Sequence, residues 1–506
     1  MERQPIGINR NKNMGVSPEH LNPRILEPSV QKKIRRTKII CTIGPATCSE
    51  EMIEKLINRG MDVARINFSH GKREAHAETI DTVRMVSKRL KRPVAIMQDI
   101  QGPKIRIGTL KDKEVRLKKG DIVILTSRDI EGTSDAVSTT YKGLVDDIKE
   151  GERIFINDGL IQLDALEIKG DDIVCKVVSG GILTDHKGIN IPDTEISIPS
   201  LTEKDREDIL FGIQKGVDYI ALSFVKSGMD IEIVKGIIEK EGYSVPLIAK
   251  IERKMAVENL QDIFQAADGV MIARGDLGVE MPLEDVTIIQ KRIIKGANLN
   301  KKIVITATQM LESMIVSPRP TRAEVSDVTN AILDGSDGVM LSGETAVGKY
   351  PVESVGLMSR IIETAERNII DWSVEHYIEE GNISFTDAVC NGAVHAAHKI
   401  RAKILVVFTQ SGFTALLLSK YRPVMPIIAF TPHDQVVDRM NLYWGVIPEK
   451  MGLIHGTDEI IHELEERLLR DELVKNGDNI VITMGAAMDE IGSTNMMKIH
   501  KIGEKE

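Results

Sequence analysis

Cysteine and aromatic residues are scarce in this chain. Four of its 506 residues are cysteine, and Phe, Trp and Tyr together make up 4%. Cys41, Cys48, Cys175 and Cys390 form neither a CxxC pair nor the framework of a secreted protein, a pattern typical of reduced thiols in the cytosol. We therefore expect neither a disulfide nor a zinc site.

A basic excess and long apolar runs are also missing. The formal net charge is -9 and the isoelectric point is about 5.8, which argues against a protein that binds nucleic acid or an anionic membrane. No stretch approaches the roughly 20 apolar residues of a transmembrane helix, and the first thirty residues lack the apolar run of a signal peptide. We expect a cytoplasmic protein with no nucleic-acid or membrane partner.

The chain does contain a repeated pattern, in which a short apolar run ends in polar residues and leads into an amphipathic helical stretch. This alternation is typical of a parallel sheet. The eight runs lie at residues 38–44, 63–69, 94–100, 219–224, 247–252, 269–277, 303–309 and 338–344. They predict an α/β fold built on a (β/α)8 TIM barrel.

Two other patterns divide the chain into domains. Between the third and fourth runs, short alternating segments with Gly-Asp and Asp-Gly turns predict an inserted small β-barrel that serves as a lid. Further apolar runs near the C-terminus predict an α/β domain of about five strands. The expected division is an N-terminal extension (1–33), a catalytic barrel (34–108 and 188–355), the lid (109–187) and a C-terminal regulatory domain (356–506).

The C-terminal ends of the barrel strands are the place to look for chemistry, because active sites of such barrels lie there. These ends carry Arg65, Asn67, Ser69, His70, Asp99, Lys250, Glu252, Arg274, Gly275, Asp276, Thr306, Thr308, Ser342 and Glu344. One polar residue at a strand end often only caps or pairs, but so many together favour a catalytic site.

Two carboxylates on successive strands, Glu252 and Asp276, predict a Mg²⁺ site with room for substrate oxygens and water. The alternative is that both only form salt bridges. The Gly-Asp-Leu-Gly turn after the sixth run begins a helix, and the free N–H groups of Gly275 and Asp276 would bind a small anion.

Eight motifs in the chain resemble those of the pyruvate kinase family. They are KIICTIGPA, ARINFSHG, QGPKIR, AKIER, MIARGDLGVE, ATQMLESM, PRPTRAEVSDV and MLSGETA. The resemblance covers nearly the whole chain, and the domain order of barrel, inserted lid and C-terminal α/β domain is that of the family.

The resemblance implies transfer of the phosphoryl group of phosphoenolpyruvate to ADP, which gives pyruvate and ATP. It implies that Lys250 and Arg65 contact the transferring phosphoryl group, and that Glu252 and Asp276 hold Mg²⁺, with Mn²⁺ as an alternative. Phosphoryl transfer is catalysed mainly by positioning and positive charge, which fits these residues.

The remaining catalytic roles also follow from the resemblance. The substrate carboxylate would bind the amides of Gly275 and Asp276 and the Thr308 hydroxyl. Thr308, Ser342 and Glu344 would form the relay that protonates the enolate through an ordered water.

For the nucleotide, the sequence has no GxxxxGK[ST] loop and no dinucleotide fingerprint, so separate side chains must bind its phosphates. The resemblance places Asn67, His70, Arg106 and Lys187 there. Many relatives have an aromatic residue where this chain has Ala75, which leaves the packing of the adenine unassigned.

Many family members bind K⁺ through groups that match Asn67, Ser69, Asp99 and the carbonyl of Ile100. Their motif D-T-K-G-P-E reads D-I-Q-G-P-K here, so that Lys104 replaces a glutamate. As in relatives with this pattern, we expect the Lys104 ammonium to replace the cation and K⁺ not to be required. The alternative is a solvated lysine at a strand end.

In the C-terminal domain, TQSGFTALLLSKYR (409–422) predicts a turn followed by a helix, which is a good phosphate-binding design. The resemblance implies a phosphorylated allosteric effector bound by Thr409, Ser411, Gly412 and Thr414, whereas plain helix capping is the alternative. Gln410 replaces a lysine of relatives that respond to fructose 1,6-bisphosphate, which favours a sugar monophosphate, AMP or no effector.

A homotetramer is expected from the family alone. Two other functions remain open from the sequence: a Mg²⁺-dependent lyase that acts on a pyruvate-like substrate, and an inactive protein that only binds phosphorylated metabolites. Lys250, Glu252 and Asp276 are all present, which argues against the inactive protein.

Overall fold

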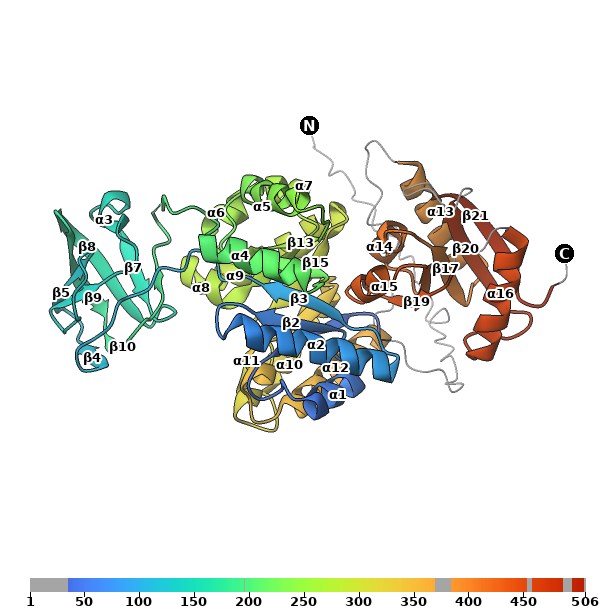
Figure 1. The fold of residues 1–506 in the computed structure, drawn as a ribbon, viewed down its shortest axis with the longest axis horizontal. Coiled ribbons are helices and arrows are strands. Elements are labelled where there is room, and N and C mark those ends of the chain that lie inside the picture. Colours follow the sequence, from blue (N-terminus) through green and yellow to red (C-terminus); the bar gives the residue numbers. More distant parts are fainter. Residues whose placement is uncertain (1–34, 195, 369–383, 453–456, 486–493, 505–506) are drawn as a thin grey trace, which may run out of the picture. The chain divides into compact units, whose positions relative to one another are not determined.

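The computed structural model describes residues 35–194, 196–368, 384–452, 457–485 and 494–504. The expected N-terminal extension (1–33) lies outside them. The chain is an α/β protein with three groups of strands: a closed parallel barrel, a β-rich insertion and a mostly parallel five-stranded sheet (Figure 1).

The (β/α)8 barrel is confirmed. Its strands, in the described residues, close in the order β1-β16-β15-β14-β13-β12-β3-β2. They are β1 (Lys38–Ile43), β2 (Val63–Asn67), β3 (Ala95–Asp99), β12 (Tyr219–Leu222), β13 (Leu247–Ile251), β14 (Gly269–Ala273), β15 (Ile303–Ala307) and β16 (Gly338–Leu341). All neighbouring pairs are parallel, so every C-terminal strand end lies at one mouth of the barrel.

The barrel strands are shorter than the apolar runs that predicted them. The run 269–277 leaves the sheet after Ala273, and α8 begins at Arg274. The run 303–309 ends as a strand at Ala307, because Thr308 and Gln309 adopt left-handed backbone angles of φ 66° and 55°. Because the strands end at these positions, the polar residues that follow lie at the mouth of the barrel.

Helices cover the outside of the barrel, where α1 packs against both α2 and α12 (Figure 1). The barrel helices are α1 (Glu50–Arg59), α2 (Arg73–Leu90), α4 (Glu203–Gln214), α5 (Gly228–Lys240), α6 (Lys254–Glu258), α7 (Leu260–Ala266), α8 (Arg274–Glu280), α9 (Leu283–Leu299), the 3-10 helix η2 (Glu312–Ile315), α10 (Arg322–Leu333), α11 (Gly343–Ala346) and α12 (Pro351–Asn368). Their ends follow the sequence: Ser49 caps α1, and Gly60 ends it at φ 118°, which favours glycine.

The inserted segment is β-rich, as expected, and is drawn in cyan and green in Figure 1. Its strands form a six-stranded sheet, β11-β7-β8-β9-β5-β6, and a two-stranded sheet, β10-β4. The elements are β4 (Glu114–Leu117), β5 (Ile122–Thr126), β6 (Ala136–Ser138), α3 (Leu144–Asp147), β7 (Arg153–Ile156), β8 (Ile161–Lys169), β9 (Asp172–Ser179), β10 (Gly181–Thr184) and β11 (Ile189–Asn190).

The two chain segments that join the lid to the barrel lie side by side. Arg106 and Gly188 form an antiparallel bridge, and the N–H of Ile107 donates to the carbonyl of Lys187 at 2.9 Å. The lid is therefore inserted through one narrow, paired connection.

In its described residues the C-terminal domain has the expected five strands, in the order β19-β18-β17-β20-β21, and among these only β21 is antiparallel. Its elements are α13 (Phe385–Lys399), β17 (Ile404–Phe408), α14 (Phe413–Lys420), β18 (Ile427–Thr431), α15 (Asp434–Met440), β19 (Val446–Lys450), α16 (Thr457–Arg470), β20 (Asn479–Gly485) and β21 (Thr494–Lys501).

A buried ion cluster joins the end of α14 to the barrel. Lys420 pairs with Asp337, the residue before β16, and also donates to the Oδ1 of Asn298 at 3.0 Å. Arg422 lies 2.8 Å from the other oxygen of Asp337 and stacks over Trp444. Burial lowers the pKa of Lys420 to about 8, although Asp337 opposes this shift.

None of the described helices is both long enough and apolar enough to cross a lipid bilayer.

Candidate active site

A buried carboxylate, Asp99, organises the mouth of the barrel. Its Oδ2 accepts from Nε of Arg65 at 2.7 Å, and its Oδ1 lies 3.2 Å from Nζ of Lys250. The three residues lie in the C-terminal halves of β2, β3 and β13, and each exposes 9% or less of its surface. Burial alone would raise the pKa of Asp99, but Arg65 and Lys250 outweigh it and hold that pKa below its usual value.

Lys250 also contacts Glu252, with 2.8 Å between Nζ and Oε1. Burial opposes the charge of the lysine, but Asp99 and Glu252 together raise the pKa of Lys250 above its usual value. The ammonium is therefore protonated at neutral pH. It is a fixed positive charge at the centre of the site.

Glu252 has the properties of a metal ligand. Its Oε2 accepts the N–H of Phe224 at 2.8 Å, which fixes the orientation of the carboxylate. Burial raises the pKa of Glu252; Lys250 opposes the shift, and the negative charge of Asp276 adds to it. This repulsion between two carboxylates is what a divalent cation would relieve.

Within the described ranges, no cluster of three or more His, Cys, Asp or Glu side chains could hold a metal. The candidate site therefore offers two carboxylate side chains, those of Glu252 and Asp276. Such a pair fits Mg²⁺, which usually keeps waters and binds substrate oxygens besides one or two carboxylates.

Gly275 and Thr308 face each other across the ends of β14 and β15. The sequence predicted a free N–H at Gly275, but in the structure this N–H donates to Oγ1 of Thr308 at 2.9 Å. Arg274 supports the loop after β15 by donating to the carbonyl of Thr308 at 2.8 Å and pairing with Asp327. The predicted carboxylate-binding groups are thus brought together but bonded to each other.

Ser342 and Glu344 lie at the end of β16 and are also brought together. Oε2 of Glu344 accepts the N–H of Ser342 at 2.7 Å, and Oε1 accepts the N–H of Leu311 at 3.0 Å. Among the described residues the buried Oγ of Ser342 has no hydrogen-bond partner. Thr306 does not join this group, because its hydroxyl bonds to that of Ser336 at 2.8 Å.

Two residues of the site were missed from the sequence. Ser223 donates to the carbonyl of Ile100 at 2.7 Å and accepts from Nζ of Lys250 at 2.7 Å. Thr42 accepts from Nη1 of Arg65 at 2.9 Å. Ser223 lies within the fourth apolar run (219–224) and directly follows β12, so a search of all eight strand ends, rather than of the charged ones, would have found it.

The loop after β2 lies in a field of positive charge. Asn67 shapes this loop by accepting the N–H of Ser69 at 3.2 Å. The pKa of His70 is lowered by burial and then by Arg106, Lys104 and Arg65. Arg106 itself donates to the carbonyl of His186, next to Lys187, so the four predicted nucleotide residues come from the loop after β2 and the paired lid connection.

Lys104 lies on the same side of the site but does not neutralise Asp99 in this structure. The positive partners of Asp99 are Arg65 and Lys250, and no ion pair to Lys104 occurs among the described residues. The Lys104 stem packs close to Gly188, where an added Cβ would lie 3.0 Å from its Cε. The Ile100 carbonyl, expected as a cation ligand, accepts from Ser223 instead.

The predicted effector loop has an internal hydrogen-bond network. Oγ1 of Thr409 accepts the N–H of Gly412 at 3.0 Å, and the buried hydroxyls of Thr414 and Thr494 lie 2.7 Å apart. Oγ of Ser411 accepts the N–H of Phe413 at 3.4 Å, at the start of α14. These hydroxyls bond within the loop and to Thr494, whereas the N-cap of α14 is Gly412, which has no side-chain cap hydrogen bond and whose φ of 87° favours glycine.

Comparison with known proteins gives one consistent result. Residues 34–355 match the family described as pyruvate kinase, barrel domain, and residues 387–500 match pyruvate kinase, alpha/beta domain. The pyruvate kinase of Clostridium perfringens is 45% identical over 93% of this chain and all of its own length. That of Geobacillus stearothermophilus is 44% identical over 93% of this chain and 81% of its own length.

A solved structure agrees. The crystal structure of a pyruvate kinase from Cryptosporidium parvum superposes with a TM-score of 0.88 at 38% identity, over 94% of this chain and 99% of its own.

Proposed function

Because the chain belongs to the pyruvate kinase family, and is therefore a phosphotransferase, we propose that its barrel mouth transfers the phosphoryl group of phosphoenolpyruvate to ADP. The observation that carries the proposal is the buried cluster of Arg65, Asp99, Lys250 and Glu252. Two buried cations beside a buried carboxylate that could bind a metal are what a loose, anionic phosphoryl-transfer transition state needs.

In the proposed mechanism, Arg65 and Lys250 bind the transferring phosphoryl group. Asp99 orients both cations, because each of its oxygens is bonded to one of them. Lys250 also donates a hydrogen bond to Ser223, and Arg65 donates one to Thr42. The cations are thus aligned before the substrate arrives, so little reorganisation accompanies the reaction.

Glu252 and Asp276 would hold Mg²⁺, with Mn²⁺ as an alternative. The ion supplies positive charge that binds substrate oxygens and neutralises charge on the transferring group. Glu252 is fixed for this role by the Phe224 amide, and Asp276 stands in the first turn of α8.

The substrate carboxylate would bind the amides of Gly275 and Asp276 and the hydroxyl of Thr308. In that case it takes over the bond that the Gly275 amide now makes to Thr308. Thr308 and Ser342 would then hold the water that protonates the enolate carbon. Both oxygens of Glu344 accept backbone amides, so its role in the relay is to position Ser342.

For the nucleotide phosphates we propose Asn67, His70, Arg106 and Lys187. The positive charges that lower the pKa of His70 support this assignment.

Three further proposals concern other parts of the protein. We propose that Lys104 replaces K⁺ near Asn67, Ser69, Asp99 and Ile100. We also propose that a phosphorylated effector binds at Thr409, Ser411, Gly412 and Thr414, and that the protein is a cytoplasmic homotetramer. These finer assignments rest on the resemblance.

The test is the turnover of phosphoenolpyruvate and ADP with Mg²⁺ by the wild type, Lys250→Met and a control, Lys215→Met. Lys215 pairs with Asp81 on the surface. We expect wild-type turnover, a loss of at least about 10² in kcat for Lys250→Met, and no loss for the control. Near-normal turnover of Lys250→Met would contradict the mechanism, and an inactive wild type would contradict the function.

A further inference from the structure

Helix α4 supports the loop that follows β2. Nζ of Lys204 donates to the carbonyl of Phe68 at 2.9 Å and to Oδ2 of Asp208, one turn further along α4, at 2.7 Å. Phe68 is the residue between Asn67 and Ser69. The lysine therefore holds the middle of the loop to which we assign nucleotide phosphate contacts.

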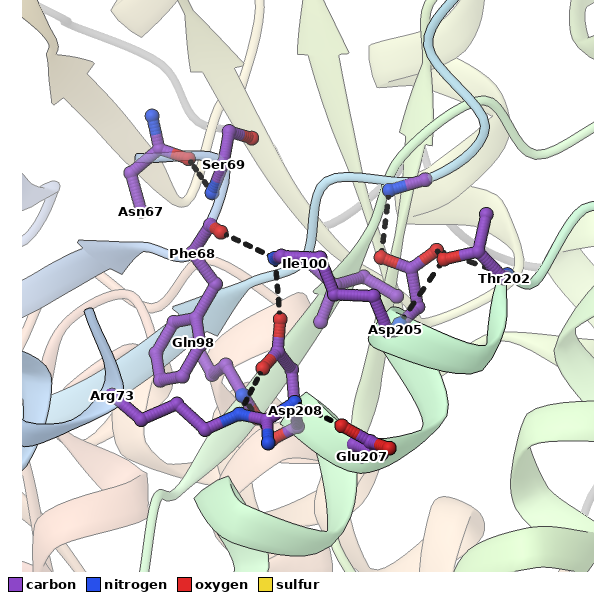
Figure 2. Close-up of polar contacts among 12 residues, drawn as sticks. Asn67, Phe68, Ser69, Arg73, Gln98, Ile100, Thr202, Asp205, Glu207 and Asp208 are labelled. Atoms are coloured by element: carbon purple, nitrogen blue, oxygen red, sulfur yellow. Dashed lines mark hydrogen bonds and ion pairs between the residues drawn. The ribbon is translucent and has the colours of Figure 1, made fainter. Parts of the chain in front are cut away.

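Asp208 extends this support to the other end of the loop. It exposes 1% of its surface, and its Oδ1 accepts from Nε of Arg73 at 2.6 Å. Arg73 is the first residue of α2, directly after the loop. Asp208 thus joins two cations that hold the loop at its middle and at its end, and Figure 2 shows it pointing from α4 toward Arg73.

Packing on the same helix reinforces the contact. The ring of Phe68 stacks on His76 with 4.3 Å between ring centroids, and lies 6.1 Å from the ring of Phe211 on α4. The backbone of Phe68 is therefore fixed by a hydrogen bond on one side and by its buried ring on the other. A shift of α4 relative to β2 would move the loop directly.

The same helix also holds the second loop of the site. Oδ1 of the buried Asp205 accepts the N–H of Gly102 at 3.0 Å, and Asp205 forms a capping box with Thr202 (Figure 2). Gly102, at φ 68°, begins the turn that leads to Lys104. Both loops that border the nucleotide side of the site thus share one support.

We propose that Lys204 and Asp208 are positioning residues that set the affinity for the nucleotide, by fixing the 67–71 loop at the distance from β3 that its phosphate contacts require. The inference rests on the proposed nucleotide contacts of Asn67 and His70. Neither residue reaches the reacting atoms, so both act through the loop. Displacing binding groups by about 1 Å typically costs up to about 10² in rate or affinity.

The experiment compares Lys204→Met with a matched control, Glu207→Gln, on the same helix. Glu207 pairs with the outer side of Arg73 at 2.8 Å and does not contact Phe68. The KM for ADP is measured at saturating phosphoenolpyruvate and Mg²⁺, the KM for phosphoenolpyruvate at saturating ADP, and the Tm of each variant by calorimetry. Half of the Lys204 side chain is already exposed (51%), so its removal leaves the core intact.

We expect Lys204→Met to raise the KM for ADP at least about tenfold, with kcat and the KM for phosphoenolpyruvate within about threefold of wild type and an unchanged Tm. Lys204→Arg, which can still donate to the Phe68 carbonyl, should recover most of the affinity. Glu207→Gln should behave as wild type.

Asp208→Asn is the second variant, and is expected to raise the KM for ADP further and to lower the Tm, since it leaves Arg73 and Lys204 without their shared carboxylate. An unchanged KM for ADP in folded Lys204→Met would overturn the inference even if Asp208→Asn does not fold. Equal increases in both KM values would also overturn it, because they indicate general disturbance. An inactive wild type would instead reject the proposed function.

Discussion

Lys250 and Glu252 form an ion pair, with 2.8 Å between Nζ and Oε1. In the proposed mechanism Lys250 binds an anionic phosphoryl group and Glu252 binds a cation. Before these ligands bind, each of the two side chains is the charge partner of the other. The pair keeps both charges compensated in the buried site before the ligands bind. A bound phosphoryl group and metal ion would take over part of this compensation, which makes the site sensitive to pH and to metal concentration.

The first prediction concerns this sensitivity. Burial raises the pKa of Glu252, and only the ionised carboxylate binds a cation, so protons and Mg²⁺ compete for it. We expect the acid limb of kcat/KM for phosphoenolpyruvate to lie above the ordinary glutamate pKa at low Mg²⁺. It should move to lower pH as Mg²⁺ is raised.

The measurement is a set of pH profiles at Mg²⁺ concentrations from far below to far above half-saturation. Glu284, an acidic residue in the first turn of α9, provides the control variant Glu284→Gln, which should give the wild-type profiles. An acid limb that stays at one pH at every Mg²⁺ concentration would contradict the assignment of Glu252.

A second prediction tests the proposed role of Lys104. Wild-type activity should be the same with and without KCl at constant ionic strength, in buffers free of K⁺, NH₄⁺ and Na⁺. Lys104→Glu removes the tethered ammonium and adds a carboxylate to the site, so it should be activated by K⁺ at least about tenfold, the effect of about 1.4 kcal/mol.

Lys111→Glu makes the same charge change on an exposed lysine of the lid and should remain independent of K⁺. If the wild type itself requires K⁺, or if Lys104→Glu is equally active in both buffers, Lys104 does not replace the cation.

A third prediction separates the hydroxyl of Thr308 from its backbone. A β-branched residue at φ 66° is strained, and such strain costs on the order of 1–3 kcal/mol where function retains it. Thr308→Val keeps the branched side chain but removes the hydroxyl, and should lower kcat by about 10²–10³. Thr308→Ser keeps the hydroxyl and relieves the crowding.

We expect Thr308→Ser to keep kcat within about tenfold of wild type and to have an equal or higher Tm. Calorimetry and steady-state kinetics on both variants decide the matter. Full activity of Thr308→Val would contradict the proposed role of the Thr308 hydroxyl.

A fourth prediction concerns stability. The pKa of Lys420 is lowered by burial to about 8 in the folded protein, against an ordinary value near 10.4 in the unfolded chain. Below pH 8 both states bind this proton, so the group adds no pH dependence there. Between pH 8 and about 10 the unfolded state binds more protons, and the free energy of unfolding should rise with pH, by up to about 1.4 kcal/mol per pH unit.

Denaturant unfolding of the wild type and Lys420→Met between pH 7 and 10 should show this rise as a difference between the two proteins. Lys399→Met, an exposed site on α13, should parallel the wild type. Parallel curves for Lys420→Met would show that the lysine keeps its proton, through its contact with Asp337.

Much of the fold could be predicted from the sequence, because barrel strands buried on both faces give continuous apolar runs. Their ends could not. The predicted run 269–277 extended past Arg274, Gly275 and Asp276 to Leu277, but the backbone leaves the sheet at Ala273. The left-handed angles at Thr308 and Gln309 have no local sequence signal either, since neither residue is glycine or asparagine.

For the site, charged residues at strand ends were predictable and their pairing was not. The sequence predicted Lys104 near Asp99 and placed Arg65 and Lys250 at the phosphoryl group, but it did not indicate that Arg65 and Lys250 are ion partners of Asp99. Distance along the chain favoured the near lysine, while the barrel brings together residues that are 34 and 151 positions from Asp99. Ser223 was missed because it is neutral, and Lys204 was missed because it lies on a helix. In a sequence, both resemble ordinary polar surface residues.

The bridge between Arg106 and Gly188 makes the lid a removable module. Its two connecting strands are paired, so the points where the chain leaves and re-enters the barrel are about 5 Å apart. A two-residue turn can span that gap, so we expect an insertion of another length or sequence to fit between these two positions while β3 and α4 keep their spacing.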